Sequence, residues 1–378
     1  MEILILIILL LVLVKTVLSH ILAWRHIRFD RAPPPAALPF ISIIKPVRGL
    51  DQDAEENFLS FIHSDYPAGF EVCFCVEERD DPAVPLIQRL IADARPAGKV
   101  RLVFSKRRDQ RELGKTINLM AGIAESGRDI LVLSDSDVRN TPGFLEEVVR
   151  PLSKPRVGMA YACPVYRGAR DWAAGLMALT VNETILALTS APPFAAIGST
   201  IAVRRDVLDA IGGLGPIRHR IGMDAALGRA VSAKGYRIEL IPQPVTIIHH
   251  HSSLKSWWQQ LHRWLVTIRR YLGPAYLVTL FYAFPVPWAT LYLLLCAAQG
   301  RSRQGLVVWG LVLAARVASL AAVNLMYAKE PTLWRYLWLV PFLDFLKIPL
   351  WVESYLNPYV VWRGRRYRVM PDATIRPA

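Results

Sequence analysis

Near its start the sequence carries an almost unbroken apolar run from Ile3 to Trp24, interrupted by Lys15 and His20. A run of roughly twenty apolar residues is long enough to cross a bilayer as one helix. Basic residues follow directly: Arg25, His26, Arg28 and Arg31. Because loops rich in Lys and Arg stay on the cytoplasmic side, we expect this end of the anchor to face the cytoplasm. A cleaved signal peptide is the alternative, but the acid Glu2 precedes the run and no small-x-small cleavage site follows it.

Three more apolar segments lie near the other end of the chain: 276–298, 306–326 and 333–362. The first two are long enough to span, whereas the third is interrupted by prolines and contains Asp344 and Lys347. The basic stretch 362–368 that follows should be cytoplasmic. If the central domain and this stretch share one side, the chain crosses the membrane an even number of times after residue 275. We therefore predict that 333–362 is re-entrant or split.

The composition agrees with a protein at a membrane. The 378 residues are 53% hydrophobic and carry a formal net charge of +14, and excess basic charge beside apolar runs favours anionic lipid as a partner. Nucleic acid is the competing explanation, but the sequence has no nucleic-acid motif or basic helix, so we predict no nucleic-acid partner. The four cysteines, Cys73, Cys75, Cys163 and Cys296, match no zinc spacing, and we expect reduced thiols.

Between the membrane segments, apolar stretches typical of strands alternate with helical patterns. The expected strands are 41–47, 71–78, 100–105, 129–135, 157–161, 198–204 and 236–241. The expected helices are 55–63, 85–94, 114–125, 142–149, 172–189, 206–211 and 223–234. This alternation predicts an α/β domain built on a mainly parallel sheet with right-handed crossovers.

These features predict five consecutive regions in the chain. They are an anchor at 1–24, a linker at 25–38, an α/β domain at 39–253, an amphipathic helix at 254–275, and a membrane region with a basic tail at 276–378. The linker contains three consecutive prolines, which make it short and stiff.

Two carboxylates follow the buried strand 129–135 at once, Asp135 and Asp137. At a spacing of i and i+2 on a strand, both side chains point to the same side. The carboxyl end of a strand in an open α/β sheet is where ligands bind. Two oxygen donors there suit a hard divalent cation that takes its remaining ligands from water and substrate phosphates. The alternative is an ordinary turn, in which Asp and Ser are common.

Further polar residues lie on both sides of this pair in the sequence. Glu78, at the end of the second strand, precedes the pair, whereas Asp224, in the first turn of a helix, and then Gln260, Arg263 and Trp264 follow it. The last three lie on the amphipathic segment 254–271, which is rich in Trp and Arg. Such a helix is typical of the membrane interface. An ordinary surface helix with its tryptophans in the core is the alternative.

Taken together, three spaced acids followed by a Q-x-x-R-W stretch resemble the pattern of membrane glycosyltransferases of the ceramide glucosyltransferase type (family 21). Four other stretches are similar to that family: 45–51, 75–82, 205–214 and 362–368. The resemblance covers nearly the whole chain. It implies a GT-A fold facing the cytosol, with a Rossmann-like, mostly parallel sheet, flanking helices, and transmembrane helices at both ends. It also implies UDP-glucose as the donor and a lipid hydroxyl as the acceptor.

The resemblance assigns roles to individual residues. Glu78 matches the acid that binds the nucleoside, and Lys45, in the family-like stretch 45–51, is predicted to bind the donor nucleotide as well. Asp135 and Asp137 match the pair that holds Mg²⁺ or Mn²⁺, which would neutralise charge on the departing UDP. Asp224 matches the catalytic base, which would take the proton of the acceptor hydroxyl in a single, inverting displacement.

Arg263 would meet the diphosphate with its planar fork of donors, beside Gln260, and Trp264 would stack near the sugar or acceptor. The sequence departs from the family at two positions. Glu78 stands where the family usually has Asp, and Met223 precedes the base where the family has an acid.

Two other groups of residues have either a functional or a purely structural role. His249 or His251, in a run of three histidines outside the family pattern, could complete the metal site, or the run is a solvated loop. Lys115 and Asn118 lie at an expected helix start, where the helix N-terminus favours phosphate.

The predicted function is therefore an inverting hexosyltransferase that moves glucose from UDP-glucose to ceramide or a similar membrane lipid, as in glycosphingolipid biosynthesis. A close alternative is transfer of N-acetylglucosamine or another sugar to a hopanoid alcohol such as bacteriohopanetetrol. A processive polysaccharide synthase shares the motifs but needs more spans for a channel. A receptor or scaffold with a degenerate transferase domain would not need all the acids. We expect an integral protein of a bacterial inner membrane with its catalytic domain in the cytoplasm.

Overall fold

The computed structural model describes residues 1–93, 99–190 and 196–378. The chain forms two compact units. Unit 1 comprises 1–25, 166–190 and 249–361, and unit 2 comprises 26–165, 191–248 and 362–378. Unlike the five consecutive regions expected from the sequence, each unit is assembled from separated stretches of chain. In particular, 166–190 belongs to unit 1 with the apolar helices, and 362–378 belongs to unit 2, where its strands form part of a separate three-stranded sheet.

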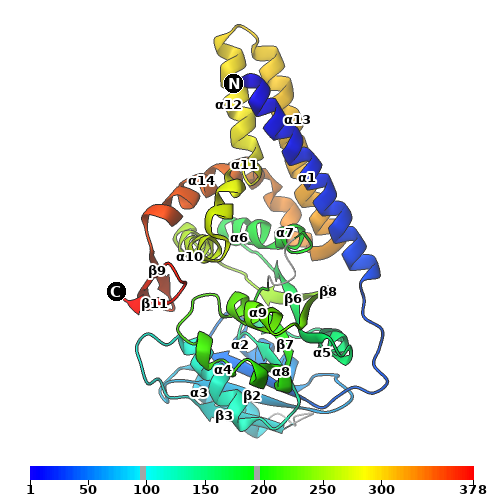
Figure 1. The fold of residues 1–378 in the computed structure, drawn as a ribbon, viewed down its shortest axis with the longest axis vertical. Coiled ribbons are helices and arrows are strands. Elements are labelled where there is room, and N and C mark those ends of the chain that lie inside the picture. Colours follow the sequence, from blue (N-terminus) through cyan, green and yellow to red (C-terminus); the bar gives the residue numbers. More distant parts are fainter. Residues whose placement is uncertain (94–98, 191–195) are drawn as a thin grey trace. The chain divides into compact units, whose positions relative to one another are not determined.

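Unit 2 is built on a mixed eight-stranded sheet in the order β3-β2-β1-β4-β7-β6-β8-β5 (Figure 1). Its strands are β1 (Ile41–Val47), β2 (Phe70–Val76), β3 (Lys99–Phe104), β4 (Ile130–Ser134), β5 (Val138–Arg139), β6 (Val157–Arg167), β7 (Thr200–Arg204) and β8 (Arg237–Ile248). Its helices are α2 (Ala54–Ile62), α3 (Ala83–Asp93), α4 (Gly114–Glu125), α5 (Phe144–Val149), α8 (Arg205–Ala210) and α9 (Met223–Ala233). Short 3-10 turns cover Arg150–Ser153 and Gly215–Ile217. The final residue of the expected helix 85–94 lies outside the described residues.

The half of the sheet that follows the predicted pattern is parallel. β1 pairs in parallel with β2 and β4, and β2 pairs in parallel with β3. β1, β2 and β4 are buried at every residue, as expected for apolar strands covered on both faces. Beyond β4 the sheet is antiparallel at the pairs β4–β7, β7–β6 and β8–β5. The predicted α/β fold is confirmed, and the parallel part brings the ends of β1, β2 and β4 to one edge.

A glycine permits the close approach of α4 to this parallel half. A Cβ built on Gly122 would lie 2.5 Å from both Cys75 Sγ and Ile44 Cγ2. No larger residue fits there without displacing β1 or β2, so this contact sets the position of α4 and of Lys115 in its first turn. All four cysteines are free and buried, in agreement with reduced thiols.

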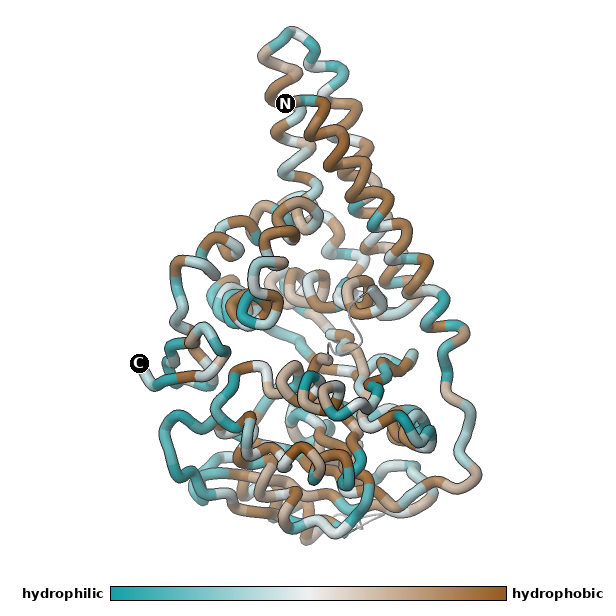
Figure 2. The backbone as a smooth tube through the Cα atoms, viewed as in Figure 1, coloured by the Kyte–Doolittle hydropathy of each residue, from teal (hydrophilic) through white to brown (hydrophobic). Residues whose placement is uncertain are grey.

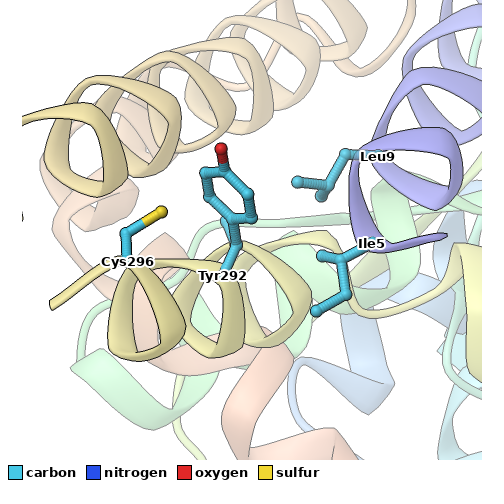
Figure 3. Packing of buried hydrophobic residues seen from close by; sticks show 5 residues of the cluster. Ile5, Leu9, Tyr292 and Cys296 are labelled. Atoms are coloured by element: carbon cyan, nitrogen blue, oxygen red, sulfur yellow. The ribbon is translucent and has the colours of Figure 1, made fainter. Parts of the chain in front are cut away.

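Unit 1 is helical. Its elements are α1 (Glu2–Phe29), α6 (Trp172–Asn182), α7 (Thr184–Leu188), α10 (Leu254–Leu272), α11 (Thr279–Tyr282), α12 (Pro285–Ala298), α13 (Ser302–Val323) and α14 (Val340–Leu356). Shorter turns of 3-10 type cover Gly273–Val278 and Pro331–Leu339, and a π-helical turn covers Asn324–Ala328. Figure 2 shows that α1 is apolar over most of its length. Its Ile5 and Leu9 pack with Tyr292 and Cys296 of α12 (Figure 3).

Two described helices are long and apolar enough to cross a membrane, 2–29 and 302–328. The expected single span at 276–298 is wrong as a straight helix, because the chain bends by 51° between Tyr282 and Pro285. Pro285 has no N–H to donate and disfavours helical backbone at Phe284, which takes φ −131° and ψ 59°. The segment 333–362 is divided between a 3-10 turn, α14 and a strand, β9 (Tyr359–Trp362).

Unit 1 also contains an ion-pair network around one fully buried carboxylate. Arg316 of α13 contacts Glu183 at 2.7 Å and Asp344 of α14 at 3.1 Å. Lys347 of α14 contacts the same Glu183 at 2.5 Å. The Asp344 side chain is fully buried, so its charge depends on Arg316 for compensation. This network ties α13 and α14 to the end of α6, and it explains the charges of Asp344 and Lys347 inside the apolar segment 333–362.

Candidate active site

The carboxylates predicted as a metal pair lie at the carboxyl end of β4. The ladder with β7 continues one step past the strand, since Asp135 N donates to Ser199 O at 3.0 Å. The chain then turns, with Val138 N donating to Asp135 O at 3.3 Å, before β5 begins. Asp137 Oδ1 is buried, and no hydrogen-bond partner for it lies among the described residues. Burial, together with the nearby charges of Asp135 and Asp51, raises the pKa of the Asp137 carboxyl.

Two lysines support this turn from neighbouring elements. Lys45, at the end of β1, is fully buried, and its Nζ donates to Asp135 O at 2.7 Å. Burial lowers the pKa of Lys45 to about 7. Through its hydrogen bond to Asp135 O, Lys45 holds the turn that carries Asp135 and Asp137 in place. Direct contact of Lys45 with a nucleotide stays a prediction. Lys115 contacts Asp135 Oδ1 at 2.5 Å and donates to Gly198 O at 3.1 Å.

Asp224 lies in the same unit, in the first turn of α9. It packs directly on the backbone of Gly198, where an added Cβ would lie 2.8 Å from Asp224 Cβ. Burial raises the pKa of the Asp224 carboxyl, while the charge of Lys115 opposes the shift. Lys115 thus connects Asp135 to the segment against which Asp224 rests. Lys115 therefore contacts Asp135 of the predicted metal pair, and its charge also acts on the predicted base Asp224, although the two acids are about 90 residues apart in sequence.

Asp51 is a further carboxylate at this site that the sequence did not single out. Its Oδ2 accepts from Ser136 Oγ at 2.6 Å, and Ser136 lies between the two predicted metal ligands. Its two oxygens also bind the Arg363 guanidinium at 2.7 and 3.0 Å. The only sequence signal for it was its place in the family-like stretch 45–51.

Glu78 lines a pocket of about 300 Å³ with Arg48, Gly49, Asp80, Asp81, Pro82 and Arg363. The Glu78 carboxylate is half-exposed and pairs with Arg365 at 3.1 Å. Its neighbour Glu77 instead forms a two-pronged pair with Arg107, at 2.8 Å for each bond. Of these two adjacent acids, Glu78 is therefore the one that faces a pocket.

The described residues hold no preformed group of three or more metal-ligating side chains. The Asp135 and Asp137 carboxylates nevertheless fit a hard cation that keeps part of its shell for water and phosphate. The buried, unpartnered Asp137 oxygen supports this fit, because a carboxylate oxygen removed from water and left unpaired is unfavourable without a cation.

The remaining predicted residues belong to unit 1. On α10, Gln260 Nε2 donates to Tyr166 OH at 3.2 Å, and Arg263 and Trp264 are partly buried. Trp257 of the same helix is fully buried and donates to Thr180 of α6 at 3.2 Å, so part of the apolar face packs within the unit. In the histidine run, His251 pairs with Asp171 at 3.1 Å.

His249 packs against the Tyr166 ring, at 5.2 Å between centroids. Metal binding by either histidine stays a prediction. In unit 2, Asn118 is buried and donates to Val47 O at 3.1 Å, which indicates a structural role in fixing α4 against β1.

A parallel half-sheet that ends at β4, with a carboxylate pair directly after β4, antiparallel strands beyond it and an acid in the first turn of α9, is the arrangement of a GT-A fold. A solved structure with this fold is the mannosyltransferase PcManGT from Pyrobaculum calidifontis, in complex with GDP-Man and Mn²⁺. The likeness has a TM-score of 0.56 at 18% identity, and it covers 94% of this chain and 99% of that one.

The family model for glycosyl transferase family 21 matches residues 4–375. The chain belongs to this family and is a hexosyltransferase. Ceramide glucosyltransferase 1 of Caenorhabditis elegans is 21% identical over 380 residues, covering 95% of this chain and 78% of the relative. Ceramide glucosyltransferase 3 of the same organism is 22% identical and covers 66% of this chain and 55% of the relative. A ceramide glucosyltransferase of Komagataella phaffii is 29% identical over 125 residues, or 32% of this chain and 24% of the relative.

Proposed function

We propose that this protein transfers a hexose, glucose in the first instance, from a UDP-sugar to the hydroxyl of a membrane lipid of the ceramide type. The observation that carries the proposal is the arrangement of Asp135, Asp137 and Asp224 around Lys115 at the carboxyl end of β4. The names of the relatives support a ceramide-like acceptor, and the two long apolar helices support access to a lipid.

In the proposed reaction the Asp224 carboxylate takes the proton of the acceptor hydroxyl. The hydroxyl oxygen attacks the anomeric carbon as the bond between that carbon and the β-phosphate oxygen breaks, so that UDP leaves and the configuration inverts. Asp224 is partly buried and its carboxyl has a raised pKa, which suits a general base. Asp135 and Asp137 would hold Mg²⁺ or Mn²⁺, which supplies positive charge to the leaving diphosphate when bound.

The other assignments from the family pattern are part of the same proposal. Glu78 would bind the nucleoside in its pocket. Arg263, beside Gln260, would bind the diphosphate, and Trp264 would stack near the sugar or the acceptor. We propose a bacterial inner membrane as the location, with unit 2 on the cytoplasmic side. Transfer to a hopanoid alcohol is the second candidate acceptor reaction, since it requires the same donor-side residues.

The test is transfer by the purified full chain in detergent or nanodiscs, with radiolabelled UDP-glucose, UDP-galactose or UDP-N-acetylglucosamine. Ceramide, a hopanoid polyol and diacylglycerol are supplied separately as acceptors, each with Mn²⁺ or with EDTA. We expect one labelled glycolipid that forms only with the divalent cation. Label in a high-molecular-mass product that grows with time would indicate a polysaccharide synthase instead. No transfer from any of these donors to any of these lipids would refute the proposal.

A further inference from the structure

The C-terminal residues form a small sheet whose hairpin tip carries two arginines. Strands β9, β10 (Arg365–Val369) and β11 (Ile375–Pro377) pair in the order β11-β10-β9. Arg363 and Gly364 join β9 to β10, and both have positive φ, at 48° and 77°. Two-residue turns of this kind favour Asn or Gly at the first position, because a larger side chain is strained there. An arginine in that position indicates that its side chain is needed for another purpose.

The Arg363 guanidinium reaches the predicted metal site. It binds both oxygens of Asp51, at 2.7 and 3.0 Å, and Asp51 in turn accepts from Ser136. Its positive charge also acts on the carboxylates of Asp135 and Asp137. About 42% of the Arg363 side chain remains exposed, so the fork is accessible from solvent even while it is paired.

The same hairpin borders the pocket that contains Glu78. Arg363 lines this pocket together with Arg48, and Arg365 pairs with Glu78, another of the lining residues. A volume of about 300 Å³ is at the lower end of the range for small-molecule sites. Three acidic residues, Glu78, Asp80 and Asp81, and two arginines, Arg48 and Arg363, therefore line this pocket. Because Arg363 also acts on the carboxylates that follow β4, it stands where the phosphates of a nucleotide bound in this pocket would meet the predicted metal site.

We propose that Arg363 is a donor-binding residue that grips the diphosphate of the nucleotide-sugar, exchanging the carboxylate of Asp51 for phosphate oxygens. This inference rests on the proposed function and adds a residue to its donor site. A planar guanidinium binds a phosphate in the same two-pronged way as a carboxylate, so the geometry seen with Asp51 is the geometry that a phosphate group requires. The C-terminal segment is then part of the catalytic unit in function as well as in packing.

The test is binding of UDP and of uridine, each with Mn²⁺, to the full chain and to its Arg363→Ala and Arg363→Lys variants. Isothermal titration gives the UDP affinity, and saturation-transfer NMR gives that of the weaker uridine. Arg376→Ala is the matched control, because it removes an exposed arginine from β11 of the same small sheet. Thermal unfolding of each variant checks that the hairpin still folds.

We expect Arg363→Ala to weaken UDP binding about ten- to a hundredfold, the usual effect of losing hydrogen bonds to a charged group. Arg363→Lys should be intermediate, because it keeps the charge but loses the fork. Uridine, which has no phosphate, should bind both variants as it binds the wild type, and the control should match the wild type for both ligands. Equal UDP affinity in wild type and Arg363→Ala would overturn the inference and leave the proposed function standing. Wild-type protein that binds no UDP would overturn both.

Discussion

Replacement of Asp224 by Asn separates the catalytic from the structural contribution of this side chain. Asn has nearly the same shape, so it fits against the backbone of Gly198, where space for the side chain is narrow. It cannot accept the proton of an acceptor hydroxyl. Loss of a general base typically lowers the rate 10²- to 10⁴-fold, which corresponds to about 3–5 kcal/mol in the barrier. We expect this loss in kcat, with the affinity for UDP unchanged.

The raised pKa of Asp224 also predicts the direction in which Asp224→Asn changes the stability of the folded protein. Because burial raises its pKa in the folded protein, the folded state binds the proton more tightly than the unfolded state does. The charged form is therefore unfavourable for folding as pH rises above the ordinary Asp range. Asp224→Asn should melt at the same temperature as the wild type at pH 7, or at a higher one, while being nearly inactive.

The assay is steady-state transfer of labelled sugar from pH 4 to pH 9, with thermal unfolding at each pH. The wild-type rate should fall on the acidic side as Asp224 becomes protonated, with a midpoint above the usual pKa of about 4 for Asp. Asp129→Asn is the matched control, since Asp129 is exposed at the opposite end of β4. Activity of Asp224→Asn within a factor of about three of wild type would refute the role of Asp224 as the base.

Three further predictions concern packing and thiol chemistry. Gly122→Val should destabilise unit 2 by about 1–3 kcal/mol in chemical unfolding, because its side chain collides with β1 and β2; unchanged stability would show that α4 can move away. Arg316→Met should destabilise unit 1 by about 3–5 kcal/mol in detergent, since it leaves Glu183 and the buried Asp344 without their shared partner, whereas a melting temperature equal to wild type would contradict the pairing. The Cys73 thiol, whose pKa is raised by burial to about 11, should resist a thiol reagent at pH 8 in the folded protein and react after unfolding; rapid labelling of the native protein would show that β2 is accessible.

The sequence was a good guide to the parallel half of the sheet. Strands such as Ile41–Val47 and Ile130–Ser134 are apolar throughout, and they are buried throughout because helices cover both faces. The placement of Asp135 at the end of β4 follows from the strand alone. The proximity of Asp224 to Lys115 does not follow from local pattern, and the family resemblance implied only that Asp224 and the carboxylate pair serve one active site.

Features that depend on distant packing were missed. The strands of the C-terminal sheet are short, and Arg363–Gly364 is not one of the common Asn-Gly or Asp-Gly turns, so the stretch 362–368 reads as a basic tail. The sequence did not predict a role for Asp51 beyond its place in the family-like stretch 45–51. Its role depends on contacts with Ser136 and with Arg363 of the β9–β10 hairpin, both distant in sequence. The assignment of 166–190 to the helical unit depends on contacts such as that of Gly175 with Tyr336, which no local pattern indicates.

The central claim is that the carboxylates after β4 hold a divalent cation together with a nucleoside diphosphate. The most direct measurement is Mn²⁺ binding followed by electron paramagnetic resonance, with and without UDP, in the wild type and in Asp137→Asn. We predict that the wild type binds Mn²⁺ more tightly when UDP is present and that Asp137→Asn loses most of this binding while remaining folded. Equal Mn²⁺ affinity in the two proteins would contradict the account, as would binding that is indifferent to UDP.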